Sequence, residues 1–246
     1  MKRIVLAFPG IERLAATIAR ELHAECAAVD VHRFPDGEAL VTLPPDLDDR
    51  DVALVATLRD PDALALPLRF AAATARELGA RRVGLVAPYL AYMRQDQRFA
   101  PGQAVSAALF ARFLQDSFDW LVTVDPHLHR IDRLDRVFDI PAQQIASAGL
   151  VANWIGANIP DAVVLGPDSE SQQWVAEVAR LAGRSYEVLR KVRSGDRSVK
   201  ISVPASKALL TGTPVLLDDI ASSGRTMVTA INRLRQIGAR TPVSVH

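Results

Sequence analysis

Cysteine is almost absent from the sequence, because Cys26 is the only one in the chain. A single thiol can form neither an intramolecular disulfide nor a zinc site built from several cysteines. Long apolar runs are also lacking, and the first one, Ile4–Phe8, ends at a Pro-Gly pair. It is too short for a signal peptide, and no run approaches the ~20 residues of a membrane helix. We therefore expect a cytoplasmic protein with no membrane partner.

An excess of one charge is missing as well, since 29 Lys and Arg residues balance 28 Asp and Glu residues. The net charge of +1 excludes a strong overall attraction to nucleic acid, so no nucleic-acid partner is expected. Hydrophobic residues make up 49% of the 246 residues, which is enough for a packed core. A chain of this length predicts one large domain or two small ones.

Short apolar segments alternate with helical segments along the chain. Strands are predicted at 4–8, 27–31, 51–58, 82–87, 120–124, 162–165, 214–217 and 242–245, and helices at 11–23, 64–78, 105–114, 149–159, 171–182 and 226–238. Pro67 is expected to fall in the first turn of its helix, where proline is tolerated. This alternation predicts an α/β fold with largely parallel sheets flanked by helices. Pro141 and residues 143–149 place a boundary near residue 145, which gives domains 1–145 and 146–246.

Polar residues follow several of these strands, and ligands of open parallel sheets bind at the carboxyl ends of strands. The strand at 214–217 runs directly into Asp218 and Asp219. Residues 222–226 (Ser-Ser-Gly-Arg-Thr) then begin a helix, whose backbone N–H groups and dipole favour an anion. Two carboxylates beside an anion site suit the vicinal hydroxyls of a sugar phosphate, or a metal that holds them. A capped helix without a ligand is the alternative, but capping alone does not require two acids.

Residues 215–226 resemble the phosphoribosyl-diphosphate (PRPP) binding motif of type I phosphoribosyltransferases and PRPP synthetases. Other segments resemble those of the synthetases in the same order: Arg33–Glu38, Pro88–Asp96, Val124–His127, Gly166–Asp168 and Lys191–Arg193. The chain is thus similar to the ribose-phosphate diphosphokinase (PRPP synthetase) family over residues 4–246, and Asp96–Phe99 looks closer to its archaeal-type branch. The resemblance implies two phosphoribosyltransferase-like domains, with the ATP-side loops in the first and the ribose-phosphate loop in the second.

The resemblance also implies an activity and a set of site residues. The diphosphoryl group of ATP would pass to the 1-hydroxyl of ribose 5-phosphate, which gives PRPP and AMP. The implied ATP contacts are Phe34, Asp36, Glu38, Arg94, Gln95 and Asp96, and the implied ribose-phosphate contacts are Asp218, Asp219, Ser222, Ser223, Gly224, Arg225 and Thr226. Mg²⁺ is implied at His127 and Asp168, and Lys191 and Arg193 are the implied catalytic cations. Family members assemble, so a homo-oligomer is expected by analogy.

Three departures from the family pattern stand out. Ser169-Glu170-Ser171 follows Asp168, where the family usually has two glycines. In the ribose loop, Ser222 stands where an acid is frequent, and Arg225 stands where a small residue is frequent. The family chain also continues beyond the position of His246, so either residues are absent from this sequence or the second domain is shorter.

These departures leave two alternatives to the main hypothesis. One is a related diphosphotransferase with a different phosphosugar acceptor. The other is a non-catalytic homologue that binds nucleotides and regulates an active enzyme. A phosphoribosyltransferase is disfavoured, because residues 33–38 and 94–96 resemble ATP-side loops rather than a nucleobase hood.

Overall fold

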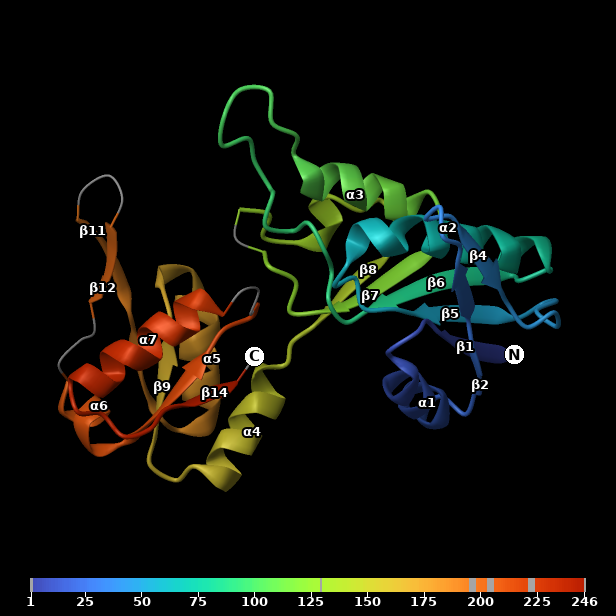
Figure 1. Ribbon diagram of the computed structural model, residues 1–246. Coiled ribbons are helices and arrows are strands. Elements are labelled where there is room, and N and C mark those ends of the chain that lie inside the picture. Colours follow the sequence, from blue (N-terminus) through green and yellow to red (C-terminus); the bar gives the residue numbers. More distant parts are fainter. Residues whose placement is uncertain (1, 129, 195–197, 203–205, 221–223, 246) are drawn as a thin grey trace. The chain divides into compact units, whose positions relative to one another are not determined.

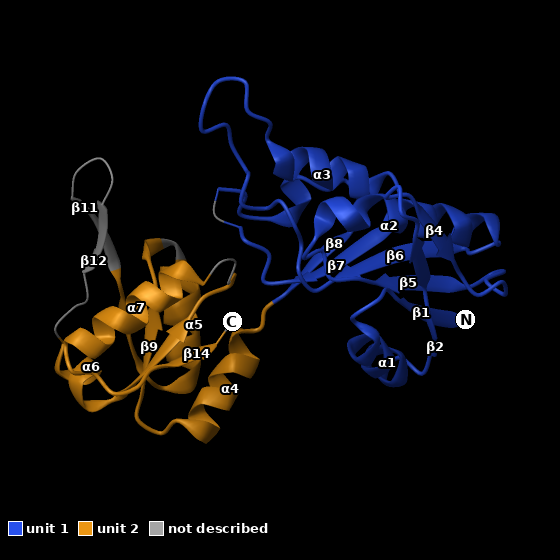
Figure 2. Ribbon diagram, viewed as in Figure 1, with its two compact units in different colours: residues 1–145 blue, residues 146–246 orange. Residues whose placement is uncertain are grey.

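Two parallel β-sheets, each with helices on both faces, confirm the predicted α/β fold class (Figure 1). The computed structural model describes residues 2–128, 130–194, 198–202, 206–220 and 224–245, without the side chains of residues 170, 190–194 and 198–202. The chain divides into two compact units, residues 1–145 and 146–246 (Figure 2). No helix in the described ranges is long and apolar enough to cross a membrane.

The sheet of unit 1 has the strand order β2-β1-β5-β6-β7-β8, and all neighbouring strands are parallel. Its strands are β1 (Arg3–Ala7), β2 (Glu25–Ala28), β5 (Asp51–Val55), β6 (Arg82–Ala87), β7 (Trp120–Val124) and β8 (Ala142–Ile145). The strand predicted at 27–31 is instead split. At Val29 the chain leaves the sheet and enters a separate antiparallel hairpin of β3 (Asp30–Arg33) and β4 (Ala39–Thr42).

Alternation along β1 explains why helices cover both faces of this sheet. Val5 and Ala7 pack with α1 (Glu12–Glu21), whereas Ile4 and Leu6 belong to the core under α2 (Pro61–Glu77) and α3 (Ser106–Gln115). Figure 1 shows α1 on one side of the sheet and α2 and α3 on the other. A short 3-10 helix, η1 (Leu134–Arg136), precedes β8.

Helix α2 corrects the expectation for Pro67. The helix begins at Pro61, so Pro67 lies inside it and not in its first turn. Pro61 suits the first helical position, where an N–H would have no helical partner. Proline has no N–H, so Pro67 leaves the carbonyl of Ala63 without its i+4 donor. The guanidinium of Arg33 donates a hydrogen bond to that carbonyl.

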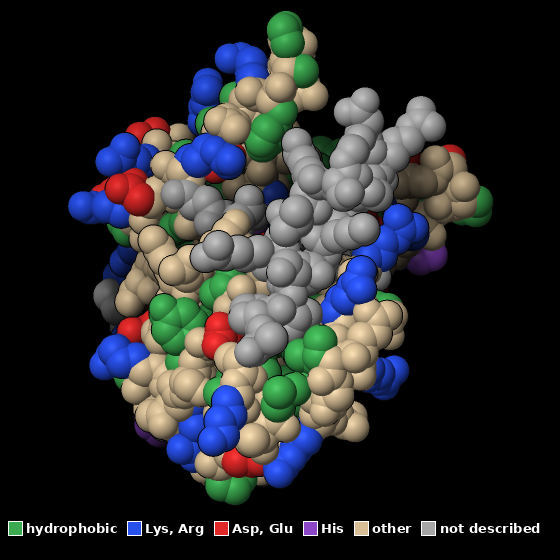
Figure 3. Space-filling model, turned by 90° about the vertical axis from the view of Figure 1, so that its left-hand side faces the viewer, with side chains coloured by type: hydrophobic (Ala, Val, Ile, Leu, Met, Phe, Trp, Pro, Cys, Tyr) green, Lys and Arg blue, Asp and Glu red, His purple; other side chains and the backbone are tan. Residues whose placement is uncertain are grey.

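Unit 2 contains a parallel sheet with the strand order β10-β9-β13-β14. The strands are β9 (Ala162–Gly166), β10 (Ser185–Val188), β13 (Thr213–Leu217) and β14 (Val243–Val245). One face packs against α4 (Ala148–Asn158) and α5 (Gln172–Ala182), and the other against α6 (Lys207–Thr211) and α7 (Arg225–Gln236). The 3-10 helix η2 (Ser169–Ser171) and an antiparallel hairpin of β11 (Arg190–Ser194) and β12 (Ser198–Ser202) complete the elements. On the face in Figure 3, basic and acidic side chains are interspersed.

Candidate functional site

The β3–β4 loop of unit 1 carries Phe34, Asp36 and Glu38 in a tight turn. The N–H of Gly37 donates to the carbonyl of Phe34 at 3.0 Å, and the N–H of Glu38 donates to Oδ1 of Asp36 at 3.1 Å. The Phe34 ring is 42% exposed, with its centroid 4.7 Å from that of His32. The loop and α2 enclose a pocket of about 640 Å³, lined in part by Asp36 and Glu38. An aromatic ring and two acids on one turn can bind a planar base with amino hydrogens.

The loop after β6 carries the second group of predicted ATP contacts. Arg94 and Gln95 are exposed, so their polar ends are accessible to a ligand. Asp96 differs, because its side chain is only 4% exposed and forms an ion pair with Arg130 at 3.0 Å. This pair joins the loop after β6 to the segment after β7. Arg130 itself was not among the residues that the sequence singled out.

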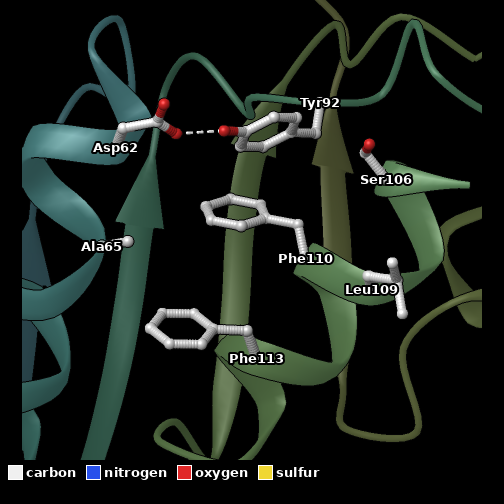
Figure 4. Close-up of a pocket in the computed structure, with 7 residues that line it drawn as sticks. All are labelled: Asp62, Ala65, Tyr92, Ser106, Leu109, Phe110 and Phe113. Atoms are coloured by element: carbon white, nitrogen blue, oxygen red, sulfur yellow. Dashed lines mark hydrogen bonds between the residues drawn. The ribbon is translucent and has the colours of Figure 1, made fainter. Parts of the chain in front are cut away.

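A second pocket, of about 320 Å³, lies where the first turns of α2 and α3 meet the loop after β6 (Figure 4). The Tyr92 hydroxyl donates a hydrogen bond to Oδ1 of Asp62, and this bond, together with burial, raises the pKa of Tyr92. The ring centroid of Tyr92 lies 4.8 Å from that of Phe110, which stacks on Phe113 at 6.0 Å. The pocket is therefore aromatic with a polar end, and Asp62 also lines the pocket beside the β3–β4 loop.

The carboxyl end of β7 leads into Asp125 and His127, both half-buried. Asp125 has a φ of 36°, in the left-handed region, which costs a non-glycine residue roughly 1–3 kcal/mol. The N–H of Asp125 donates to the carbonyl of Ile145 on β8 at 3.1 Å, which holds the backbone at this point. The backbone of Asp125 is therefore held in a strained conformation at the end of β7.

Three carboxylates gather at the carboxyl ends of β9 and β13, which are neighbouring strands. Asp168 follows β9, and Asp218 and Asp219 follow β13; all are half-buried. Burial raises the pKa of Asp218 to about 7, and the negative charges of Asp219 and Asp168 act in the same direction. This edge of unit 2 therefore concentrates negative charge, which hydroxyl donors or a cation would relieve.

The carboxylate oxygens of these acids are donors of the kind that Mg²⁺ prefers. Among the described residues, no group of three or more His, Cys, Asp or Glu side chains is placed to hold a metal. Mg²⁺ does not need such a cage, because it is bound through one or two carboxylates together with substrate phosphates and water. The oxygen donor of Asp168 fits that requirement. His127, the other predicted metal contact, belongs to unit 1, whereas Asp168 belongs to unit 2.

Helix α7 follows the two acids and begins after Gly224. This glycine has a φ of 67°, a conformation that residues with a Cβ rarely adopt. Arg225 is exposed and Thr226 is half-buried at the start of the 12-residue helix. The first N–H groups of a helix lack helical acceptors, so this end can bind an anion. The predicted contacts Ser222 and Ser223 lie outside the described residues.

The loop after Asp168 contains the Ser-Glu-Ser departure and forms η2. The hydroxyl of Ser171 is buried and donates to the carbonyl of Asp168 at 2.7 Å. The side chain of Glu170 is not among those described. The backbone of Lys191 and Arg193, the predicted catalytic cations, lies on β11 opposite Ile201 and Val199 of β12, and their side chains are likewise undescribed.

Comparison with known proteins covers nearly the whole chain. Residues 4–117 match a family model described as the N-terminal domain of ribose phosphate pyrophosphokinase, and residues 133–246 match the phosphoribosyl transferase domain. The ribose-phosphate pyrophosphokinase of Methanopyrus kandleri is 38% identical over 240 residues, which is 97% of this chain and 81% of the relative. That of Halobacterium salinarum is 34% identical over 94% of this chain and 81% of the relative.

A solved structure agrees on the fold. The phosphoribosylpyrophosphate synthetase of Mycobacterium smegmatis has a TM-score of 0.84 and 24% sequence identity. The match covers 99% of this chain and 80% of that structure.

Proposed function

The chain belongs to the ribose-phosphate pyrophosphokinase family, and from this premise we propose that it transfers the diphosphoryl group of ATP to ribose 5-phosphate. The 1-hydroxyl of the sugar attacks the β-phosphorus of ATP, the bond between the α- and β-phosphates breaks, and the products are PRPP and AMP. The observation that carries the proposal is the loop from β13 to α7. In this segment Asp218 and Asp219 follow β13, and Gly224 precedes the first residue of α7.

Unit 2 is proposed to bind the sugar phosphate. Asp218 and Asp219 accept hydrogen bonds from the ribose hydroxyls, since carboxylate oxygens are strong acceptors for such donors. The 5-phosphate binds at the start of α7, where backbone N–H groups and the helix dipole favour an anion. Ser222, Ser223, Gly224, Arg225 and Thr226 form the proposed phosphate loop, and the guanidinium of Arg225 adds a cation to it.

Unit 1 is proposed to bind ATP. The Phe34 ring stacks on adenine, while Asp36 and Glu38 accept hydrogen bonds from the amino edge of the base. Arg94 and Gln95 contact the triphosphate. Asp96, which is paired with Arg130, contributes by holding the loop after β6 in place. The exposed aromatic and acidic side chains of the β3–β4 loop support these assignments.

Mg²⁺ is the proposed cofactor, with Asp168 as an oxygen ligand and His127 acting through water or on phosphate. When bound, the ion neutralises phosphate charge, which is the main requirement of phosphoryl chemistry. Lys191 and Arg193 are proposed to stabilise the charge that develops on the transferred group. Removal of Mg²⁺ by a chelator is expected to abolish turnover.

Assembly and location complete the proposal. We propose a homo-oligomer, supported by large apolar side chains that α2 and α3 expose, namely Leu66, Phe70 and Leu109. A cytoplasmic location is proposed because ATP is the phosphoryl donor.

The test is AMP release from ATP and Mg²⁺ with and without ribose 5-phosphate. The proposal predicts AMP formation that depends on this sugar. AMP formation with another phosphosugar alone would favour the enzyme with a different acceptor. ATP binding without any turnover would favour the regulatory homologue.

A further inference from the structure

The first turn of α2 contacts both segments that are proposed to bind ATP. Asp62 accepts a hydrogen bond from the hydroxyl of Tyr92, which lies two residues before Arg94 in the loop after β6 (Figure 4). Ala63, the next residue of the helix, accepts a hydrogen bond through its carbonyl from Arg33, where the β3–β4 loop begins. Two consecutive residues of one helical turn thus bind residues that are 30 positions away on either side.

Pro67 is the reason that the Ala63 carbonyl can serve this purpose. In a regular helix this oxygen would accept from the N–H of residue 67, but proline has none. An interior proline weakens a helix, so its presence here is a local cost. The guanidinium of Arg33 takes the place of the missing donor. The proline therefore leaves this carbonyl without a helical donor, next to the β3–β4 loop.

Contacts with α2 and α3 hold Tyr92 in place. Its φ of 67° is unfavourable for a residue with a Cβ, so the surrounding contacts must maintain it. Those contacts are the hydrogen bond to Asp62 and the ring of Phe110, whose centroid is 4.8 Å away. Since the pKa of Tyr92 is raised, its hydroxyl remains a donor at neutral pH.

We propose that the first turn of α2 positions the two ATP-side segments relative to each other, with Arg33 and Tyr92 as positioning residues and Pro67 as the residue that keeps the Ala63 carbonyl available. This inference rests on the proposed function. It adds that ATP affinity depends on main-chain hydrogen bonding in α2 as well as on the side chains proposed to contact the nucleotide.

The decisive variant is Pro67→Ala, which supplies an N–H that competes with Arg33 for the Ala63 carbonyl. The helix gains a hydrogen bond and loses a buried ring, so the Tm is expected not to fall. The KM for ATP is expected to rise about 3- to 10-fold, the effect of one hydrogen bond, while the KM for ribose 5-phosphate and kcat change less than about 2-fold. Pro61→Ala is the matched control, because that residue blocks no helical bond, and it should leave all four quantities unchanged.

Arg33 variants separate this route from direct contact with ATP. Arg33→Ala should raise the KM for ATP, and Arg33→Lys, which can still donate to the carbonyl, should restore much of the loss. In the double variant of Arg33→Ala with Pro67→Ala, the second change should add nothing. Tyr92→Phe, which keeps the ring but removes the donor, should also raise the KM for ATP.

An unchanged KM for ATP in Pro67→Ala would overturn the inference, as would full additivity in the double variant. Wild-type protein that releases no AMP would instead overturn the proposed function. In that case the same variants are compared by calorimetric titration with ATP. Equal dissociation constants for wild type and Pro67→Ala would then reject the positioning role by itself.

Discussion

The hydroxyl of Ser171 occupies the space that a Cβ on residue 166 would need, because the two atoms would be only 2.4 Å apart. Gly166 ends β9, and Ser171 closes the loop by donating to the carbonyl of Asp168. Ser171 belongs to the Ser-Glu-Ser sequence that stands after Asp168 where the family usually has two glycines. Gly166, which precedes Asp168, leaves the space that the Ser171 hydroxyl occupies. The loop that carries Asp168 is fixed by a side chain packed against bare backbone.

Gly166→Ala is expected to destabilise the protein by about 1–3 kcal/mol, since the new methyl group would displace Ser171 and press on Val175, 3.3 Å away. Ser171→Ala removes the clashing oxygen. In the double variant of the two, part of the stability lost in Gly166→Ala should therefore return. Denaturant titration measures the free energy of unfolding of the single and double variants. Stability losses that simply add would contradict this packing.

Asp218 gives a pH dependence of stability with a definite sign. Its pKa is about 7 in the folded protein and close to 3.8 when unfolded, so the folded state binds the proton more tightly. The stabilising effect is complete below about pH 4 and is lost as the pH rises through 7. Without Mg²⁺, the free energy of unfolding of Asp218→Asn should therefore rise by about 2 kcal/mol relative to that of wild type as the pH goes from 5 to 8. A difference that does not change with pH, in thermal melts at both values, would contradict the crowding of the three acids.

Asp219 is expected to act on the sugar phosphate alone. Asp219→Ala should raise the KM for ribose 5-phosphate about 30-fold or more, because charged hydrogen bonds to the hydroxyls are lost. The KM for ATP should remain within about 2-fold. Steady-state kinetics with each substrate varied in turn measures both. Glu177→Ala, which removes a surface carboxylate of the same unit, is the control. Unchanged kinetics in Asp219→Ala would reject its proposed role.

Lys191 is expected to act on the transition state. Lys191→Ala should lower kcat about 100-fold or more and change the dissociation constant for ATP less than about 3-fold. Rapid-quench turnover and ATP titration separate the two quantities. Lys207→Ala removes an exposed lysine of the same unit and should change neither. If Lys191→Ala lost only ATP binding, its assignment would be wrong.

Apolar periodicity was sufficient to predict the parallel sheets and most of their helices, because buried strands and amphipathic helices leave strong local patterns. It failed where the pattern is weak. β8 has the mostly polar sequence Ala-Gln-Gln-Ile and was interpreted as a boundary segment, and β10 was not predicted. The prediction of one strand at 27–31 did not include the change of direction at Val29. That change occurs where β1 ends, so it depends on a neighbouring strand and not on the local sequence.

The candidate site shows the same division. Acids after strands and the loop before α7 are local in sequence, so their positions could be predicted from strand ends. The contacts of Arg33 with Ala63, Tyr92 with Asp62 and Asp96 with Arg130 join residues about 30 positions apart, and no local pattern reveals them. Pro67 was the one available signal, since a proline inside a helix leaves a carbonyl that another group can use.

The most direct test of the proposed reaction uses ribose 5-phosphate labelled with ¹⁸O at the 1-hydroxyl, together with ATP and Mg²⁺. Mass spectrometry then identifies both products. Attack of the 1-hydroxyl on the β-phosphorus predicts unlabelled AMP and PRPP that retains the label in the bridge between C1 and phosphorus. ADP with ribose 1,5-bisphosphate would contradict diphosphoryl transfer and assign a simple kinase activity to this fold.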